Sequence, residues 1–200
     1  MRPSFHFNPF GGLTDEEIGQ SIVPRACCDE ICDWIESGAP GIVELAGRKG
    51  RGKTTHLVYL HTLYPAYPIF LLRAGAAPEI GKVPAGSLIF IDSIHHLPLA
   101  TRLRLYRRYR LILTTHLRRA WEYRLAGLPY RSFSFRGLQE EELVRIIQQR
   151  VELAAPAQDA PVLNRPYLRA LLRRHGDDLR SIMNHLFDEF PTKSPLWHEQ

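Results

Sequence analysis

Short apolar runs alternate with helix-like stretches through the middle of the chain. The apolar runs predict strands at 42–46, 67–72, 87–91 and 110–114, and a fifth, less apolar strand at 131–135. Helices are predicted at 26–37, 53–63, 97–108 and 117–126. Strands that alternate with helices form parallel sheets covered on both faces. The pattern therefore predicts an α/β domain of three layers, with a five-stranded, mostly parallel sheet, over residues 25–136.

The two ends of the chain follow other patterns. Residues 1–24 are interpreted as an N-terminal arm lying over the surface, followed by a short helix, because Thr14 and Glu17 have the spacing of a capping box. After Gly137 the strand-like runs stop, and helices are predicted at 140–152, 164–174 and 177–189. These helices predict a small all-α lid over residues 137–190, with a tail at 191–200.

The composition is that of an ordinary globular chain. Of the 200 residues, 44% are hydrophobic and 24% charged, which excludes a disordered or collagen-like protein. No apolar run approaches the roughly 20 residues of a membrane helix, and no signal peptide is recognisable, so we expect a cytoplasmic protein. The cysteines Cys27, Cys28 and Cys32 are interpreted as small helix residues in a reducing compartment, with a zinc site as the minor alternative.

Charge is distributed unevenly along the chain. The net charge is +5. Residues 1–47 hold eight acidic residues and two basic ones, whereas residues 98–138 hold ten arginines and one acid, Glu122. A basic middle region indicates a polyanion, or an acidic neighbour, at one face of the protein.

One motif carries specific chemistry. Residues 47–54 read GRKGRGKT and match the phosphate-loop (P-loop) pattern G-x-x-x-x-G-K-[ST] in full. The glycines let successive backbone N–H groups point at a phosphate, and the helix that begins there adds its dipole. Lys53 would contact the β- and γ-phosphates, and the hydroxyl of Thr54 would contact Mg²⁺. The residues predicted to bind ATP here are Gly47, Gly50, Arg51, Gly52, Lys53, Thr54 and Thr55.

A second acidic position completes the predicted metal site. Asp92 ends the apolar run 88–91, at the carboxyl edge of a sheet where α/β proteins bind ligands. We expect Asp92 and Thr54 to hold Mg²⁺. The next residue is Ser93, and a hydroxyl does not accept a proton unaided at neutral pH. Glu44 and Glu79 are weak candidates for the missing base, so hydrolysis is expected to be slow.

With these motifs in order, the chain resembles the AAA+ and STAND families of P-loop ATPases over about residues 20–190. The resemblance implies that Arg25, in the box Ile22–Arg25, touches the nucleotide. The strand end Thr114-Thr115-His116 is similar to the sensor-one strand, which places Thr115, as a catalytic residue, beside the γ-phosphate. Residues 176–183 are similar to the sensor-two helix of replication-initiator and clamp-loader lids, with Arg180 as the sensing arginine.

Two further groups of arginines concern partners. In these families one subunit can supply an arginine finger to the next, and Arg124 and Arg131 lie in the expected region, which leaves assembly into a ring or filament open. Arginines interleaved with tyrosine in the helix 97–108 suit phosphate contact and base stacking. The same pattern suits a solvated face or an acidic partner surface. The arginines in question are Arg104, Arg107 and Arg108.

These observations give three hypotheses of function. The first is an AAA+-type ATPase that acts as a nucleotide-dependent switch on nucleic acid, or on a partner that processes nucleic acid. The second is a STAND-like signalling switch that binds a protein partner. The third is a small P-loop kinase, for which the sequence offers no acceptor-site motif.

Overall fold

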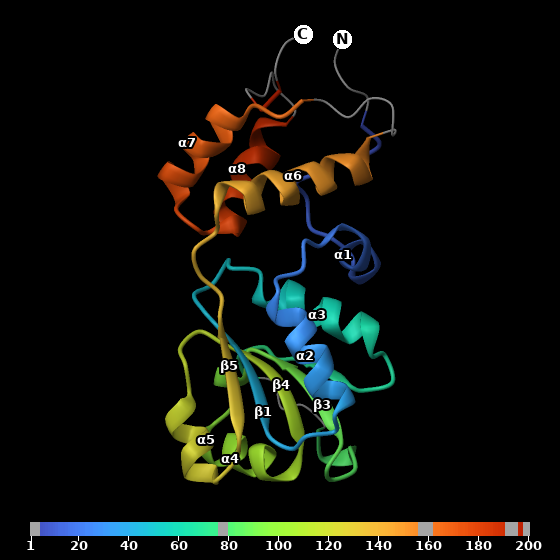
Figure 1. The fold of residues 1–200 in the computed structure, drawn as a ribbon, viewed down its shortest axis with the longest axis vertical. Coiled ribbons are helices and arrows are strands. Elements are labelled where there is room, and N and C mark those ends of the chain that lie inside the picture. Colours follow the sequence, from blue (N-terminus) through green and yellow to red (C-terminus); the bar gives the residue numbers. More distant parts are fainter. Residues whose placement is uncertain (1–4, 76–79, 156–161, 191–195, 198–200) are drawn as a thin grey trace. The chain divides into compact units, whose positions relative to one another are not determined.

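The computed structural model describes residues 5–75, 80–155, 162–190 and 196–197 (Figure 1). The chain divides by its contacts into two compact units. The core unit comprises Pro24–Lys49 and Lys53–Phe135. The helical unit comprises the chain up to Val23, the short segment Gly50–Gly52 and the chain from Arg136 onward.

A five-stranded parallel sheet forms the centre of the core unit. The strand order is β2-β3-β4-β1-β5, and every pair of neighbours is parallel. The strands are β1 (Ile42–Ala46), β2 (Ile69–Leu71), β3 (Leu88–Asp92), β4 (Arg110–Thr115) and β5 (Tyr130–Ser134). All residues of β1 and β3 are buried, as expected for strands covered on both faces. The predicted fold class is confirmed.

Helices cover both faces of this sheet. The helices of the core unit are α2 (Cys27–Glu36), α3 (Lys53–Leu63), α4 (Leu99–Arg108) and α5 (Ala120–Ala126). Side chains of α2 and α3 pack with Val43, Phe90 and Ile112 on one face. Side chains of α4 and α5 pack on the other, where the alternate strand residues Ile89 and Leu111 point.

The predicted helix starts at 97 and 117 are each a few residues early. Residues Ile94–His96 form a 3-10 turn, and Pro98 is the N-cap of α4, so this helix begins at Leu99. Helix α5 begins only at Ala120, after Arg119. No helix of the described residues is long and apolar enough to cross a membrane.

The described part of the helical unit holds four helices, of which the last three contribute to its apolar core. They are α1 (Asp15–Ser21), α6 (Glu140–Ala154), α7 (Arg165–His175) and α8 (Leu179–Glu189). The predicted capping box at Thr14 and Glu17 is present. The N-terminal arm does not only lie over the surface. It contributes Phe10 to the apolar core of this unit, where the ring is buried among Ile147, Leu168 and Leu186. Arg150 fixes the arm by donating to the carbonyls of Pro9 and Gly11, at 3.2 and 2.9 Å.

Candidate nucleotide-binding site

The P-loop connects the buried strand β1 to helix α3, as the motif requires. Gly50 and Gly52 have φ angles of 83° and 79°, a left-handed backbone that side-chain-bearing residues rarely adopt. At Gly47 a Cβ would lie 2.4 Å from the carbonyl oxygen of Phe135. The glycine pattern therefore reflects both backbone conformation and close approach of a neighbouring strand.

Lys53 is turned back over this loop. It is the first residue of α3, and its side chain is buried, at 6% exposure. The Nζ atom donates a hydrogen bond of 2.8 Å to the carbonyl oxygen of Arg48. An ammonium held across the loop in this way lies over the backbone that would wrap a phosphate.

Asp92 gathers three hydroxyl groups at the end of β3. Thr54 Oγ1 and Thr114 Oγ1 donate to Asp92 Oδ1, at 2.8 and 2.7 Å, and Ser93 Oγ donates to Oδ2 at 3.1 Å. Hard oxygen ligands of this kind suit Mg²⁺, usually with water and phosphate oxygens in the remaining positions. The carboxylate and the Thr54 hydroxyl therefore fit the predicted metal site chemically.

Ser93 occupies an unusual backbone conformation beside this carboxylate. Its φ of 59° is the one left-handed angle among the described non-glycine residues. Its N–H donates to Thr114 Oγ1 at 2.8 Å, so that Ser93 and Asp92 hold the Thr114 hydroxyl from two sides. Nothing about this hydroxyl equips it to accept a proton from water.

The two threonines at the end of β4 lie in different environments. Thr114 reaches Asp92, but Thr115 points to the opposite face of the sheet and donates to Glu44 Oε1 at 3.2 Å. Because it bonds to Glu44, Thr115 is directed away from Asp92. The residue is also fully buried. Thr114, and not Thr115, therefore lies beside the predicted metal site.

Glu44 is fully buried and serves the fold. Besides Thr115, it accepts hydrogen bonds from the N–H of Arg119 at 2.9 Å, from Tyr123 at 2.8 Å and from Ser132 at 2.6 Å. Three of these donors meet on Oε1 and Ser132 donates to Oε2, and the side chain is closed off from solvent. Glu44 is thus poorly placed as the catalytic base, and Glu79 lies outside the described residues.

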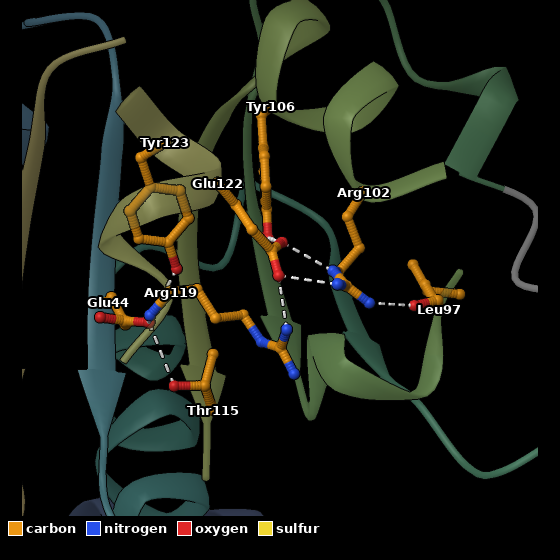
Figure 2. Close-up of polar contacts among 8 residues, drawn as sticks. All are labelled: Glu44, Leu97, Arg102, Tyr106, Thr115, Arg119, Glu122 and Tyr123. Atoms are coloured by element: carbon orange, nitrogen blue, oxygen red, sulfur yellow. Dashed lines mark hydrogen bonds and ion pairs between the residues drawn. The ribbon is translucent and has the colours of Figure 1, made fainter. Parts of the chain in front are cut away.

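A second buried carboxylate, Glu122, lies next to the Glu44 cluster (Figure 2). Arg102 donates to it through Nε and Nη2, at 2.8 and 2.7 Å, and Arg119 donates through Nη1 at 2.5 Å. The hydroxyl of Tyr106 adds a fourth bond of 2.9 Å. Sequence reasoning missed this network, although Glu122 is the single acid among ten arginines and thereby gave a signal.

Three histidine rings lie close together, tilted to one another, near the end of β4. The His95 ring lies between those of His96 and His116, with centroid separations of 4.3 and 4.2 Å. Burial and the two neighbouring histidines lower the pKa of His95 to about 4, and burial and Lys53 lower the pKa of His116. In the described part of the chain, no group of three or more His, Cys, Asp or Glu side chains is arranged to hold a metal ion.

The other predicted residues are dispersed. The Arg25 guanidinium lies 5.0 Å from the centre of the Phe135 ring, and Thr55 is half-buried on α3. Within the helical unit, Arg51 pairs with Asp177, and the N–H of Arg180 donates to the carbonyl of Gly50 at 3.3 Å. The remaining predicted arginines are exposed, namely Arg104, Arg107, Arg108, Arg124 and Arg131.

No family model and no curated protein matches this sequence. Solved structures do match. The Thermotoga maritima RuvB Holliday junction branch migration motor is similar at a TM-score of 0.56 and 16% identity, over 88% of this chain and 65% of that one. The Aeropyrum pernix Orc1 protein, solved in complex with DNA, is similar at a TM-score of 0.63 and 16% identity, over 93% of this chain and 66% of that one.

These neighbours are both AAA+ P-loop ATPases, so the likeness supports the fold that the motifs predicted. The chain spans less than two thirds of their length, 65% and 66% in the two comparisons. At 16% identity the likeness establishes the fold. Function must therefore be argued from the residues of the site.

Proposed function

We propose that this chain binds ATP with Mg²⁺ at the P-loop and acts as a slowly hydrolysing, nucleotide-dependent switch. The observation that carries the proposal is the convergence on Asp92 Oδ1 of two hydroxyls, Thr54 from the start of α3 and Thr114 from the end of β4. A P-loop, an acidic strand end and a polar neighbouring strand end are together the parts that position a nucleotide in this fold.

The roles of the residues follow from their chemistry. The loop N–H groups and Lys53 would hold the β- and γ-phosphates, and Thr54 and Asp92 would hold Mg²⁺, which would supply positive charge to offset the negative charge of the phosphates. Thr114 would present its hydroxyl to the γ-phosphate side of the site. Arg180 keeps its predicted role as the arginine that senses the γ-phosphate from the lid.

Slow hydrolysis follows from the missing base. A general base raises the rate by about 10²–10⁴-fold where it is present. Ser93 donates a hydrogen bond to Asp92, and Glu44 is fully buried and bonded to the fold through both of its oxygens, so neither is placed to accept a proton from an attacking water. A bound triphosphate would persist, which is the property that a switch needs.

Nucleic acid, or a partner that processes it, is the proposed target of the switch. Three arginines of α4 are exposed on the face of the sheet opposite α2 and α3, and this supports contact with a phosphate backbone. RuvB is a branch migration motor and Orc1 was solved with DNA, which is consistent with this target. The arginines are Arg104, Arg107 and Arg108.

The test compares ATP binding by the parent and by Lys53→Met, which keeps the apolar stem of the buried side chain. Lys49→Met, at an exposed lysine of the same loop, is the matched control. In equilibrium dialysis with labelled ATP and Mg²⁺, we expect the Lys53 variant to lose most affinity and the Lys49 variant to resemble the parent. Equal affinity of parent and Lys53→Met would refute the phosphate site.

Turnover then separates the candidate targets. ATP hydrolysis is measured alone, with duplex DNA, with single-stranded DNA and with RNA. A rate that responds to one of these supports a switch on nucleic acid. If the protein binds ATP but its hydrolysis rate is the same with duplex DNA, single-stranded DNA and RNA as without them, the result favours the STAND-like switch and a protein partner.

A further inference from the structure

Helix α5 and the turn before it expose a row of large apolar side chains. Leu117 is 78% exposed, Trp121 55% and Leu125 57%. Trp121 and Leu125 are four positions apart in α5, which places them on one side of the helix, about 6 Å from each other. Leu117 lies in the bend that precedes the helix. We call this row the α5 stripe. Exposed apolar groups gathered in this way mark interaction sites more often than single exposed residues do.

The inner side of α5 explains why the stripe stays outside. Glu122 and Tyr123 are fully buried, and they bond to Arg102, Arg119 and Glu44 beneath the helix (Figure 2). Turning the stripe inward would break these buried bonds and leave charged groups unpaired, at a high energetic cost. The rotation of the helix is therefore fixed, and the stripe is a permanent part of the surface.

The charge around the stripe has one sign. Arg118 and Arg124 are exposed on the same stretch of chain. Glu122 is the single acid between residues 98 and 138, and it is buried beneath the helix. The exposed side of this segment thus offers apolar area and guanidinium groups, and no carboxylate. Tryptophan and arginine are also the residues that most often dominate the energetics of protein interfaces.

We propose that the α5 stripe docks an acidic amphipathic helix of a partner protein. Apolar side chains of that helix would pack between Leu117, Trp121 and Leu125, as in recognition of one helix by another. Its flanking Asp or Glu residues would pair with Arg118 and Arg124. The proposal goes beyond the proposed function, since this surface does not involve the P-loop.

The acidic side of α2, offered by a second copy of this chain, fits the stripe less well. The exposed side of α2 supplies the right charge, but it exposes no large apolar residue that could pack against Trp121. Nucleic acid also fits less well, because leucines at both ends of the stripe offer neither a donor to phosphate nor a ring for stacking. The exposed acids of α2 are Asp29, Glu30, Asp33 and Glu36.

The experiment uses a library of 16-residue peptides displayed on phage. The library is selected on the whole protein and counter-selected on Trp121→Glu. We expect the retained peptides to carry apolar residues at helical spacing, three to four apart, with Asp and Glu beside them. Retained peptides that are basic, or an absence of peptides that distinguish the two proteins, would overturn the proposal.

Measured affinities sharpen the result. For a selected peptide, Trp121→Ala should weaken binding by about 30-fold or more, as loss of an interface hot spot does. Leu63→Glu changes another exposed leucine, 48% exposed at the end of α3, and should leave binding unchanged. Arg118→Glu with Arg124→Glu should abolish binding, and replacing the acids of the peptide by lysine should restore it.

Two outcomes would assign the stripe to another occupant and so refute the proposal. One is self-association of the parent in sedimentation that Trp121→Glu abolishes. The other is oligonucleotide binding that the same substitution abolishes. Melting temperature and ATP affinity of each variant establish that it is folded. Because ATP binding is measured separately, failure of the docking surface is distinguishable from failure of the nucleotide site.

Discussion

Replacing Glu122 with alanine removes an acceptor that three side chains share. Arg102 and Tyr106 are buried with it, and Arg119 is half-buried. In Glu122→Ala these groups remain while the carboxylate is lost, so buried positive charge is left without its counter-ion. Removal of one partner from a buried ion pair typically costs about 3–5 kcal/mol. Set against a usual total stability of about 5–15 kcal/mol, this is a large loss.

Urea unfolding measures this loss. Trp34 is buried in the core unit, so its fluorescence, in a background with Trp121 and Trp197 changed to phenylalanine, reports that unit. With a urea dependence of about 2 kcal/mol per molar, a loss of about 4 kcal/mol lowers the midpoint by about 2 M. Glu36→Ala, which removes an exposed hydrogen bond from Tyr64 within the same unit, should leave the midpoint nearly unchanged. A shift below about 0.5 M for Glu122→Ala would contradict the energetic role given to this network.

The same network has a predicted pH dependence. Burial by itself raises the pKa of Glu122, but the bonds from Arg102, Arg119 and Tyr106 outweigh it, and the pKa lies below the usual value of 4.5. A lowered folded-state pKa contributes stability above the unfolded value, and the contribution disappears as the pH falls through the folded value. Below about pH 4.5 the parent should therefore lose stability more steeply than Glu122→Gln.

Two further predictions concern the nucleotide site and the exposed arginines. Ser93→Glu should raise single-turnover ATP hydrolysis by about 10²-fold, the lower range for a general base; a parent rate already near the enzyme median of roughly 10 per second would contradict this. If the α4 arginines contact phosphates, a triple substitution to glutamine should flatten the slope of log affinity against log salt by roughly two to three units, with ATP binding unchanged. Filter binding at several salt concentrations measures that slope, and an unchanged slope would exclude these contacts. The residues replaced are Arg104, Arg107 and Arg108.

The parts of the fold that follow from local sequence were predictable. The helix predicted at 53–63 and the strand predicted at 42–46 have the observed bounds, because glycines and a proline delimit them. The P-loop is a contiguous motif, and its glycines have the backbone conformation that such a loop needs. Asp92 was recognisable because an acid at the end of a fully apolar strand has few structural explanations.

The choice between Thr114 and Thr115 needed the structure. Neighbouring strand residues point to opposite faces, and both threonines are polar and buried. Leu111 and Leu113 face α4 and α5, so Thr115 does as well and meets Glu44. Thr114 shares its face with Ile112, on the side of α3 where Thr54 begins the helix. The face is set by packing between distant segments, which periodicity within one strand does not reveal.

Long-range contacts explain the other difference. Phe10 lies in a Pro- and Gly-rich stretch without helical or strand periodicity, so nothing local predicted its burial among helices more than a hundred residues away. Charge patterning likewise counted the arginines of residues 98–138 without separating Arg102, which is buried on Glu122, from the exposed ones.

Glu44 gives the core unit a mechanical property. Four donors from β4, from the turn before α5, from α5 itself and from β5 meet on this one side chain of β1. These hydrogen bonds fix the position of helix α5 on the sheet, because a shift of the helix alone would stretch several buried hydrogen bonds at once. The segment that presents Trp121 must move as one body with the strand that ends at Thr115. A displacement of the end of β4 would therefore displace helix α5 and its exposed side chains by the same movement.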